Sequence, residues 1–246
     1  MEIKRLSSLT SVKMVLSDLL YVSYLVPTNR IRPLVPDILP LASVDGSNVF
    51  LSLVIFRGKV VRASLLPTPR LTFDQVNVRT YVLDPESGHY GVYFINCAIG
   101  SALITFLYRI MSGMPVEHIT LKLHNQRDHR MRYVNYSVSG YWHGDFVIEA
   151  EEAESQAEHI SPFSSKEGAI KYLIDPLIGF YGPRNHVRRI EVWHPHSPPR
   201  LARVLSSRCE YLTALGLVEE KEIRQPQNVL LVSGWPFLTF LPPQYI

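Results

Sequence analysis

Residues 71–82, LTFDQVNVRTYV, decide the fold of this sequence. Successive side chains of a strand point to opposite faces, so this stretch has two faces of different chemistry. The largely apolar face consists of Val76, Val78, Thr80 and Val82. The polar face consists of Gln75, Asn77, Arg79 and Tyr81. The pattern predicts a β-strand that places four polar side chains on one side of a sheet.

The rest of the sequence predicts short strands with few helices, an α+β class that is mainly antiparallel β. The 18 prolines and 13 glycines divide the chain into pieces that mostly alternate apolar and polar residues. The run NVFLSLVIFR at 48–57 predicts a strand buried on both faces. We expect further strands at 90–98, 116–124, 131–141, 145–151, 187–194 and 228–240, and a strand or short helix at 15–26. Helices are expected at 100–113, 165–174 and 200–215, with one helical turn at 29–34.

Length and composition favour one domain spanning residues 1–246. The chain is 46% hydrophobic and 19% charged, which is enough to bury a full core. Its formal net charge of +3 is spread along the chain, whereas nucleic-acid binding requires a clustered basic surface. The apolar run from Met14 to Pro27 contains Asp18 and is shorter than the roughly 20 residues that span a membrane. We therefore expect neither a nucleic-acid nor a membrane partner.

Motifs for cofactors and metals are missing from the sequence. It contains no GxGxxG, Walker lysine, HExxH or GxSxG, so we expect no cofactor and no metal. The segment His194-Pro195-His196 brings two imidazoles close without an adjacent third ligand and is interpreted as a loop. The two cysteines, Cys97 and Cys209, cannot build a disulfide framework and favour a cytoplasmic location.

The arginine of the polar face has two interpretations. In the structural one, Arg79 is buried and paired with a carboxylate, for which the candidates are Asp74, Glu117 and Asp145. In the functional one, Arg79 presents two parallel donors to a ligand carboxylate or enolate, and its neighbours orient it. The residues alone leave both interpretations open.

The expected strand at 116–124 carries a second group of reactive side chains. His118, Lys122 and His124 share one face, which most simply points to water because lysine is rarely buried without a partner. A pocket on that face would instead desolvate Lys122 and turn it into an amine nucleophile. Glu117 lies on the opposite, apolar face, where it either acts as an acid or base or pairs with Arg79.

Four stretches follow one another along nearly the whole chain in a familiar order. They are VSYLVPTNRIRPLVPDILPLASVDGSNVFLSLVIF, FDQVNVRTYV, GVYFINCAIG before a helix, and LTALGLV before a strand with Ser233-Gly234. Together they resemble the acetoacetate decarboxylase-like superfamily, and most closely its uncharacterised domain-of-unknown-function (YqjF-like) branch. The stretch NVRTYV at 77–82 is the most specific.

The resemblance implies a cone or partial barrel of antiparallel strands with peripheral helices around a hydrophobic pocket for a small keto acid. The decarboxylases carry a lysine pair after a proline, and its first lysine forms a Schiff base. Matching that proline to Pro115 puts Val116 and Glu117 at the two lysine positions, and neither forms an imine. Further departures are Gln75 at an acidic position and Ile174-Asp175-Pro176 in place of a Thr-Glu-Arg.

Three functions remain. The first is an enzyme that acts on a small keto, enol or polyketide-like compound by acid-base chemistry, as an isomerase, cyclase, dehydratase or lyase. The second is a binding protein for a small apolar acid, and the third is an imine-forming enzyme with a relocated lysine, Lys122. For the first, the candidate catalytic residues are Glu117, Arg79, Tyr81 and His118, and the candidate substrate-binding residues are Gln75, Asn77, Tyr93, Met114 and Val116. The expected partner is a small molecule, and a homo-oligomer is compatible with the sequence.

Overall fold

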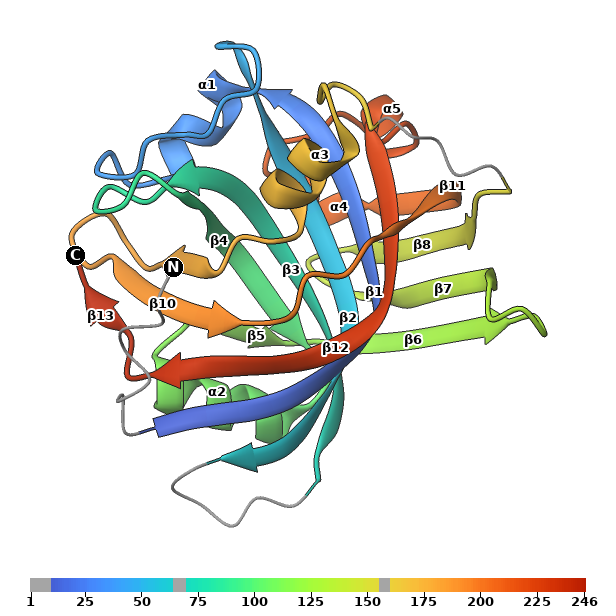
Figure 1. The fold of residues 1–246 in the computed structure, drawn as a ribbon, viewed down its shortest axis with the longest axis horizontal. Coiled ribbons are helices and arrows are strands. Elements are labelled where there is room, and N and C mark those ends of the chain that lie inside the picture. Colours follow the sequence, from blue (N-terminus) through green and yellow to red (C-terminus); the bar gives the residue numbers. More distant parts are fainter. Residues whose placement is uncertain (1–9, 64–69, 155–159) are drawn as a thin grey trace.

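A computed structural model describes residues 10–63, 70–154 and 160–246 (Figure 1). Its strands are β1 (Thr10–Pro27), β2 (Asn48–Ala63), β3 (Thr72–Leu83), β4 (Tyr90–Ile99), β5 (Val116–His118), β6 (Thr120–Arg127), β7 (Tyr133–Tyr141), β8 (Asp145–Glu152), β9 (Ile178–Tyr181), β10 (Arg188–Trp193), β11 (Arg200–Cys209), β12 (Asn228–Leu241) and β13 (Gln244–Tyr245). Its helices are α1 (Thr28–Ile31), the 3-10 turn η1 (Arg32–Leu34), α2 (Ala102–Ser112), α3 (Lys166–Leu173), α4 (Glu210–Ala214) and α5 (Glu220–Ile223). The predicted class, α+β and mainly antiparallel, is confirmed.

Seven strands close into a barrel. The pairing runs from β10 through β9, β4, β3, β2 and β1 to β12. The ring closes because β12 also pairs with β10, with Val192 opposite Thr239 and Trp193 opposite Leu238. The β4–β9 pairing is parallel, whereas the other six pairings of the ring are antiparallel. The partial barrel implied by the family resemblance is therefore a closed ring in this chain.

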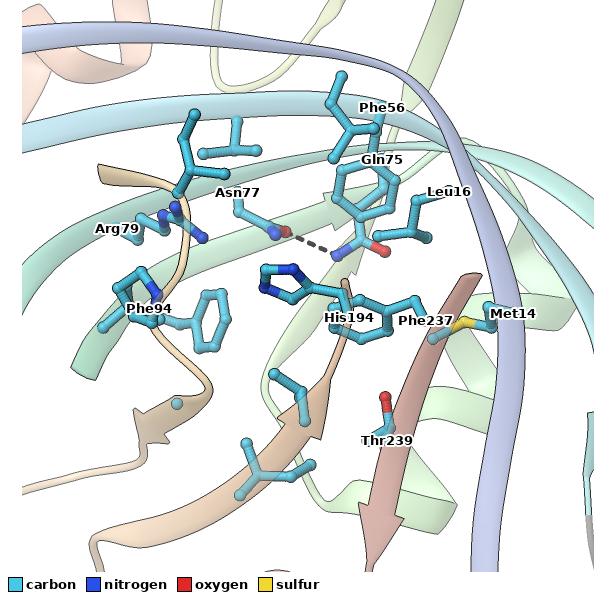
Figure 2. A pocket seen from close by; sticks show the side chains of 18 of the residues that line it. Met14, Leu16, Phe56, Gln75, Asn77, Arg79, Phe94, His194, Phe237 and Thr239 are labelled. Carbon is cyan, nitrogen blue, oxygen red and sulfur yellow. Dashed lines mark hydrogen bonds between the residues drawn. The ribbon is translucent and has the colours of Figure 1, made fainter. Parts of the chain in front are cut away.

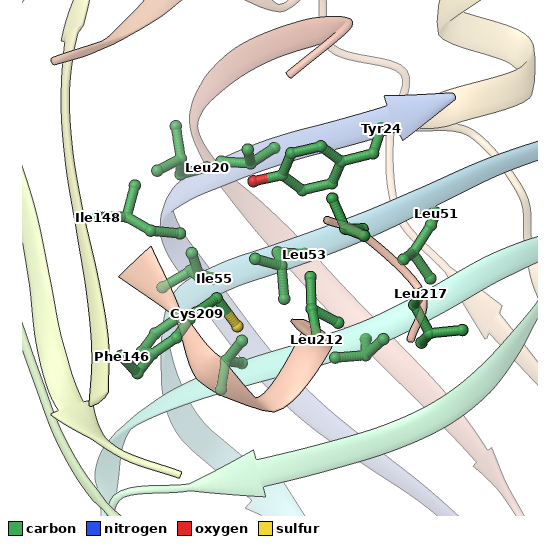
Figure 3. Packing of buried hydrophobic residues seen from close by; sticks show 14 of the residues in the cluster. Leu20, Tyr24, Leu51, Leu53, Ile55, Phe146, Ile148, Cys209, Leu212 and Leu217 are labelled. Carbon is green, nitrogen blue, oxygen red and sulfur yellow. The ribbon is translucent and has the colours of Figure 1, made fainter. Parts of the chain in front are cut away.

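The remaining strands extend the sheet away from the barrel. β11 leaves β12 and continues through β8 and β7 to β6 (Figure 1). This extension packs against the outside of β1, β2 and β3 and encloses an apolar core together with α4 and α5. Figure 3 shows its centre, where Leu53 and Ile55 of β2 meet Phe146 and Ile148 of β8. We call this region the outer core.

The barrel strands thus have a core on each side. On β3, Val76, Val78 and Val82 point into the outer core, whereas Phe73 and Tyr81 belong to the core inside the barrel. β3 is therefore buried on both faces, and so is β2, as the run at 48–57 predicted. The alternation predicted for residues 71–82 thus assigns one face of β3 to the outer core and the other to the barrel interior.

Two helices border the barrel interior. α2 begins where the Ser101 side chain accepts a hydrogen bond from the Ile104 amide, and it ends at Gly113, which has φ of 65°. Glycine adopts this left-handed conformation without strain, so the glycine-bounded helix predicted at 100–113 is confirmed. α3 begins with a similar cap from Ser165 and ends shortly before Pro176, which cannot continue a helix.

Two expectations about secondary structure are wrong. Residues 200–215 are not one helix, because 200–209 form β11 and only 210–214 are helical. Pairing with β8 and β12 places residues 200–209 in the sheet and overrides their local helical preference. The strand expected at 116–124 is interrupted at Ile119, where β5, parallel to β4, gives way to β6, antiparallel to β7. In the part of the chain described here, no helix has the length and hydropathy to cross a membrane.

Candidate functional site

A cavity of about 90 Å³ lies inside the barrel (Figure 2). All seven strands of the ring contribute to its wall, together with Tyr108 of α2, Met114 and the segment between α3 and β9. Most of the lining is aliphatic or aromatic. The main polar groups come from β3, β12 and the residue that follows β10, and they are Gln75, Asn77, Arg79, Trp235, Thr239 and His194.

Three of these polar side chains form a row on β3. Gln75, Asn77 and Arg79 are all buried, and Figure 2 shows them side by side along the cavity wall. The Gln75 Nε2 donates a hydrogen bond of 2.6 Å to the Asn77 Oδ1, which fixes the two amides relative to each other. The row therefore presents amide groups and a guanidinium to a space that is otherwise apolar.

The Arg79 guanidinium has no anionic partner among the described residues. Its Nη2 donates to the Leu173 carbonyl oxygen at 2.7 Å, at the carboxyl end of α3, while its buried Nε has no hydrogen-bond acceptor. The guanidinium carbon lies 5.3 Å from the ring centre of Tyr21 and 5.5 Å from that of Tyr81, and these π faces attract the cation. Burying a charge without a counter-ion is costly, so Arg79 is the group of the cavity wall best suited to bind an anion.

The carboxylates suggested as partners of Arg79 are engaged elsewhere. Asp74 pairs with Arg57 at 2.8 Å, Glu117 contacts His143 at 2.7 Å and Asp145 pairs with Arg208 at 3.0 Å. The interpretation of Arg79 as half of an ion pair with one of these three groups is therefore wrong.

His194 is a buried imidazole in the same cavity. Its ring stacks with those of Trp235 and Phe237, with centroid distances of 4.7 and 5.9 Å and nearly parallel planes. Burial lowers the pKa of His194 below that of a free histidine, and the positive charge of Arg79 contributes in the same direction. The Nδ1 lies 3.2 Å from the Pro195 carbonyl oxygen, which only accepts, so Nδ1 carries the proton of the neutral ring. The lone pair is then on Nε2, which is free to accept a proton.

Two further donors of the lining are unpartnered. The Trp235 Nε1 and the Thr239 Oγ1 are buried, and neither has a hydrogen-bond partner in the described chain. Burial raises the pKa of the neighbouring Tyr21 to about 12, so its phenol stays neutral. The cavity thus combines one cation, one neutral base and unsatisfied neutral donors, a set suited to an oxygen-rich anion.

Some of the site residues predicted from the sequence line the cavity, and the others lie outside it. Gln75, Asn77, Arg79 and Met114 line the cavity. Tyr81 lies behind Arg79, where its hydroxyl donates to the Leu173 carbonyl at 3.1 Å and contacts Ser52 at 2.9 Å, so it supports the guanidinium without reaching the cavity.

The other predicted residues are outside the cavity lining. Val116 is buried in the barrel core. The Tyr93 hydroxyl donates to the Gly182 carbonyl at 2.8 Å. His118 is exposed. Glu117 is opposite Ala98 in the β4–β5 pairing and so faces the outer-core side of the sheet, where Asn96 and His143 bind its carboxylate. The structure therefore does not bring the candidate catalytic residues Glu117 and His118 together with Arg79.

No lysine of the described chain lines the cavity. Lys122 is exposed on β6 and pairs in register with Ser139 of β7, in the sheet extension. The interpretation of this lysine as a solvent-facing residue is confirmed.

Sequence reasoning missed His194 and Trp235. The His194-Pro195-His196 segment was weighed as a metal site and interpreted as a loop, and neither interpretation places His194 in a cavity. The Nδ1 of His196 instead contacts Asp175 Oδ2 at 2.7 Å. Because Trp235 stacks on His194 from a distant strand, no local pattern links the two residues.

The comparisons with known proteins agree with this architecture. The model of the DUF2071 family, described as an uncharacterized conserved protein (COG2071), matches residues 13–235. The chain belongs to this family. No curated protein matches it.

Solved structures of acetoacetate decarboxylase-like proteins share the fold of this DUF2071 member. The Legionella pneumophila acetoacetate decarboxylase aligns with a TM-score of 0.62 at 9% identity, over 96% of this chain and 87% of that one. The enduracididine biosynthesis enzyme MppR, in complex with the condensation product of pyruvate and imidazole 4-carboxaldehyde, has a TM-score of 0.61 at 13% identity, over 95% and 88%. An acetoacetate decarboxylase-like enzyme from Sphingomonas wittichii RW1 has 0.57 at 12%, over 98% and 93%. The acetoacetate decarboxylase-like fold is thus confirmed.

Proposed function

We propose that this protein is an enzyme that binds a small oxo acid in the barrel cavity and moves a proton on it without forming an imine. The observation that carries the proposal is Arg79, a buried guanidinium that faces the cavity with an unpaired Nε and no carboxylate partner in the described chain. A ligand carboxylate would accept two parallel hydrogen bonds from such a group. The structural neighbours include an acetoacetate decarboxylase and a biosynthesis enzyme, and their similarity to this chain supports the fold.

His194 is the proposed base. A neutral imidazole with its lone pair on Nε2 removes a proton from the carbon next to the ligand's carbonyl, and the electron pair moves onto the carbonyl oxygen to give an enolate. The Trp235 indole N–H, which has no partner within the described residues, is the proposed donor to that oxygen. Returning the proton to a different atom gives isomerisation, and loss of a leaving group from the enolate gives a dehydratase or lyase reaction.

Two alternatives compete with this proposal. A binding protein would use Arg79 in the same way and would leave the ligand unchanged. An imine-forming enzyme needs an amine in the cavity, and the exposed Lys122 on β6 is a poor candidate for that role. We therefore place the acid-base enzyme first.

Proton transfer can be tested without knowing the natural substrate. The protein is incubated in D2O with a panel of 2-oxo acids, and loss of the proton signal at the carbon next to the carbonyl is followed by NMR. We expect faster exchange than in protein-free buffer, and we expect His194→Asn to reduce the excess at least about 100-fold, the lower end of a general base's usual contribution. His118→Asn is the matched control, because His118 is exposed and outside the cavity.

The outcome separates the three functions. Binding of an oxo acid without any exchange above the buffer rate would favour a binding protein. Trapping of a covalent adduct on a lysine by borohydride would favour the imine-forming enzyme and would contradict the proposal.

A further inference from the structure

A second cavity of about 70 Å³ lies beneath α2, next to the site. Its wall is almost entirely apolar and comes from α2 and the ends of β1, β2, β3, β10 and β12. The lining residues from α2 are Ile104, Leu107, Tyr108, Met111 and Ser112. The Ser112 hydroxyl donates to the Tyr108 carbonyl at 2.7 Å, so this polar group is already satisfied. A space of this kind favours an apolar occupant over water.

The two cavities share part of their walls. Met14, Phe73, Tyr108, Ile190 and Thr239 line both. Methionine has three rotatable side-chain bonds and adapts easily to irregular gaps, so Met14 is the shared wall residue best able to move aside for a ligand that spans both spaces. The unpartnered Thr239 hydroxyl is therefore at the junction of the polar and the apolar cavity.

The barrel strands order the two cavities along one axis. On β3, Arg79 is at the polar end and Phe73 at the shared wall, and six residues of strand separate their Cα atoms by about 20 Å. On β12, the direction from Trp235 to Thr239 also leads from the polar end to the shared wall, and their Cα atoms are about 13 Å apart. The polarity thus falls from a guanidinium, through two amides, to an apolar pocket.

We propose that the natural ligand is an amphipathic acid, whose carboxylate binds Arg79 and whose unbranched acyl or aryl tail occupies the cavity beneath α2. The inference rests on the proposed function only in taking Arg79 as the carboxylate site. Ligands as short as pyruvate or acetoacetate would leave the second cavity unused. The ligand class is therefore a 2-oxo acid or related enol with a tail of several carbons.

The test measures how affinity depends on chain length. Binding of unbranched 2-oxo acids from 2-oxobutanoate to 2-oxodecanoate is measured by NMR titration and calorimetry. Each buried methylene is expected to strengthen binding about fourfold until the cavity is full. Leu107→Phe, which fills the cavity, should weaken 2-oxodecanoate binding at least tenfold and change 2-oxobutanoate binding less than about twofold.

Two further variants keep the test decisive if the filled variant folds poorly. Met111→Ala enlarges the cavity and should shift the preferred chain to a greater length, which a damaged fold would not do. Ile110→Phe is the matched control on the same helix, since Ile110 points outward with 66% of its surface exposed, and it should change nothing.

The two proposals fail in different ways. Equal affinities along the series, combined with weaker binding of every acid by Arg79→Met, would overturn the tail site and leave the proposed function standing. Absence of binding for all the acids would overturn both. An affinity that rises with chain length in the parent protein, and that stops rising at a shorter chain in Leu107→Phe, supports the tail site.

Discussion

The inside of the barrel and the outer core are built by the same strands and have opposite properties. On β3, Val78 packs into the largely apolar outer core, whereas Asn77 and Arg79 on either side of it face a cavity (Figures 2 and 3). On β2, Leu53 belongs to the outer core and Val54 lines the cavity. The comparison indicates that the outer core stabilises the sheet, so that the barrel interior is free to hold unpaired polar groups.

The largest expected effect on stability is in the outer core. Leu53→Ala should lower the free energy of unfolding by about 2–5 kcal/mol, because Leu53 is fully buried and its removal leaves a void. Chemical denaturation measures this loss, and affinity for 2-oxo acids in the folded protein should stay unchanged. A loss of affinity larger than the loss of stability would contradict the separation of the two regions.

A smaller effect is expected where the barrel interior is tightly packed. A Cβ on Gly58 would lie only 2.8 Å from the Cε1 of Phe73, so Gly58→Ala must displace that ring. We expect a loss of about 1–3 kcal/mol in unfolding free energy, which is typical of overpacking. The double variant with Phe73→Leu should recover part of the loss, and strictly additive effects in this cycle would show that the two side chains do not interact.

The smallest effect is a pH dependence from His194. Because burial lowers the folded-state pKa of His194, the unfolded chain binds this proton more readily. This contribution to stability is complete above the ordinary histidine pKa of about 6.5 and is lost as the pH falls from there through the folded-state pKa. The same protonation removes the proposed base, so exchange should slow over the same window.

Paired variants isolate this contribution. His194→Asn should flatten the stability profile below about pH 6.5, whereas the exposed His118→Asn should not. Identical profiles for His194→Asn and the parent protein would contradict the assignment.

The local sequence pattern was sufficient to predict which side chains share each face of β3. Gln75, Asn77 and Arg79 share a face because side chains alternate along any strand, and this holds whatever the strand pairs with. The position of Glu117 could not be read in that way, because its strand breaks at Ile119 and its direction depends on parallel pairing with β4. The helix expected at 200–215 failed for a similar reason, since β11 exists only through its partner strands.

The closure of the barrel between β10 and β12 explains why the sequence did not predict the rest of the site. The β10–β12 pairing joins segments with no common sequence pattern, and it is this pairing that brings His194 and Trp235 into one cavity with Arg79. The absence of lysine at Val116 and Glu117 predicts a site without an imine, and this stays a prediction. It did not point to His194 or Trp235.

The central claim is that Arg79 binds the carboxylate of the ligand, and calorimetry tests it most directly. The tightest-binding 2-oxo acid of the panel is titrated into the parent protein and into Arg79→Met. We predict that affinity falls about 100-fold, or about 3 kcal/mol, while the free energy of unfolding does not decrease, because an unpaired buried charge is replaced by an apolar side chain. Unchanged affinity, or a loss of stability typical of a broken ion pair, would contradict the claim.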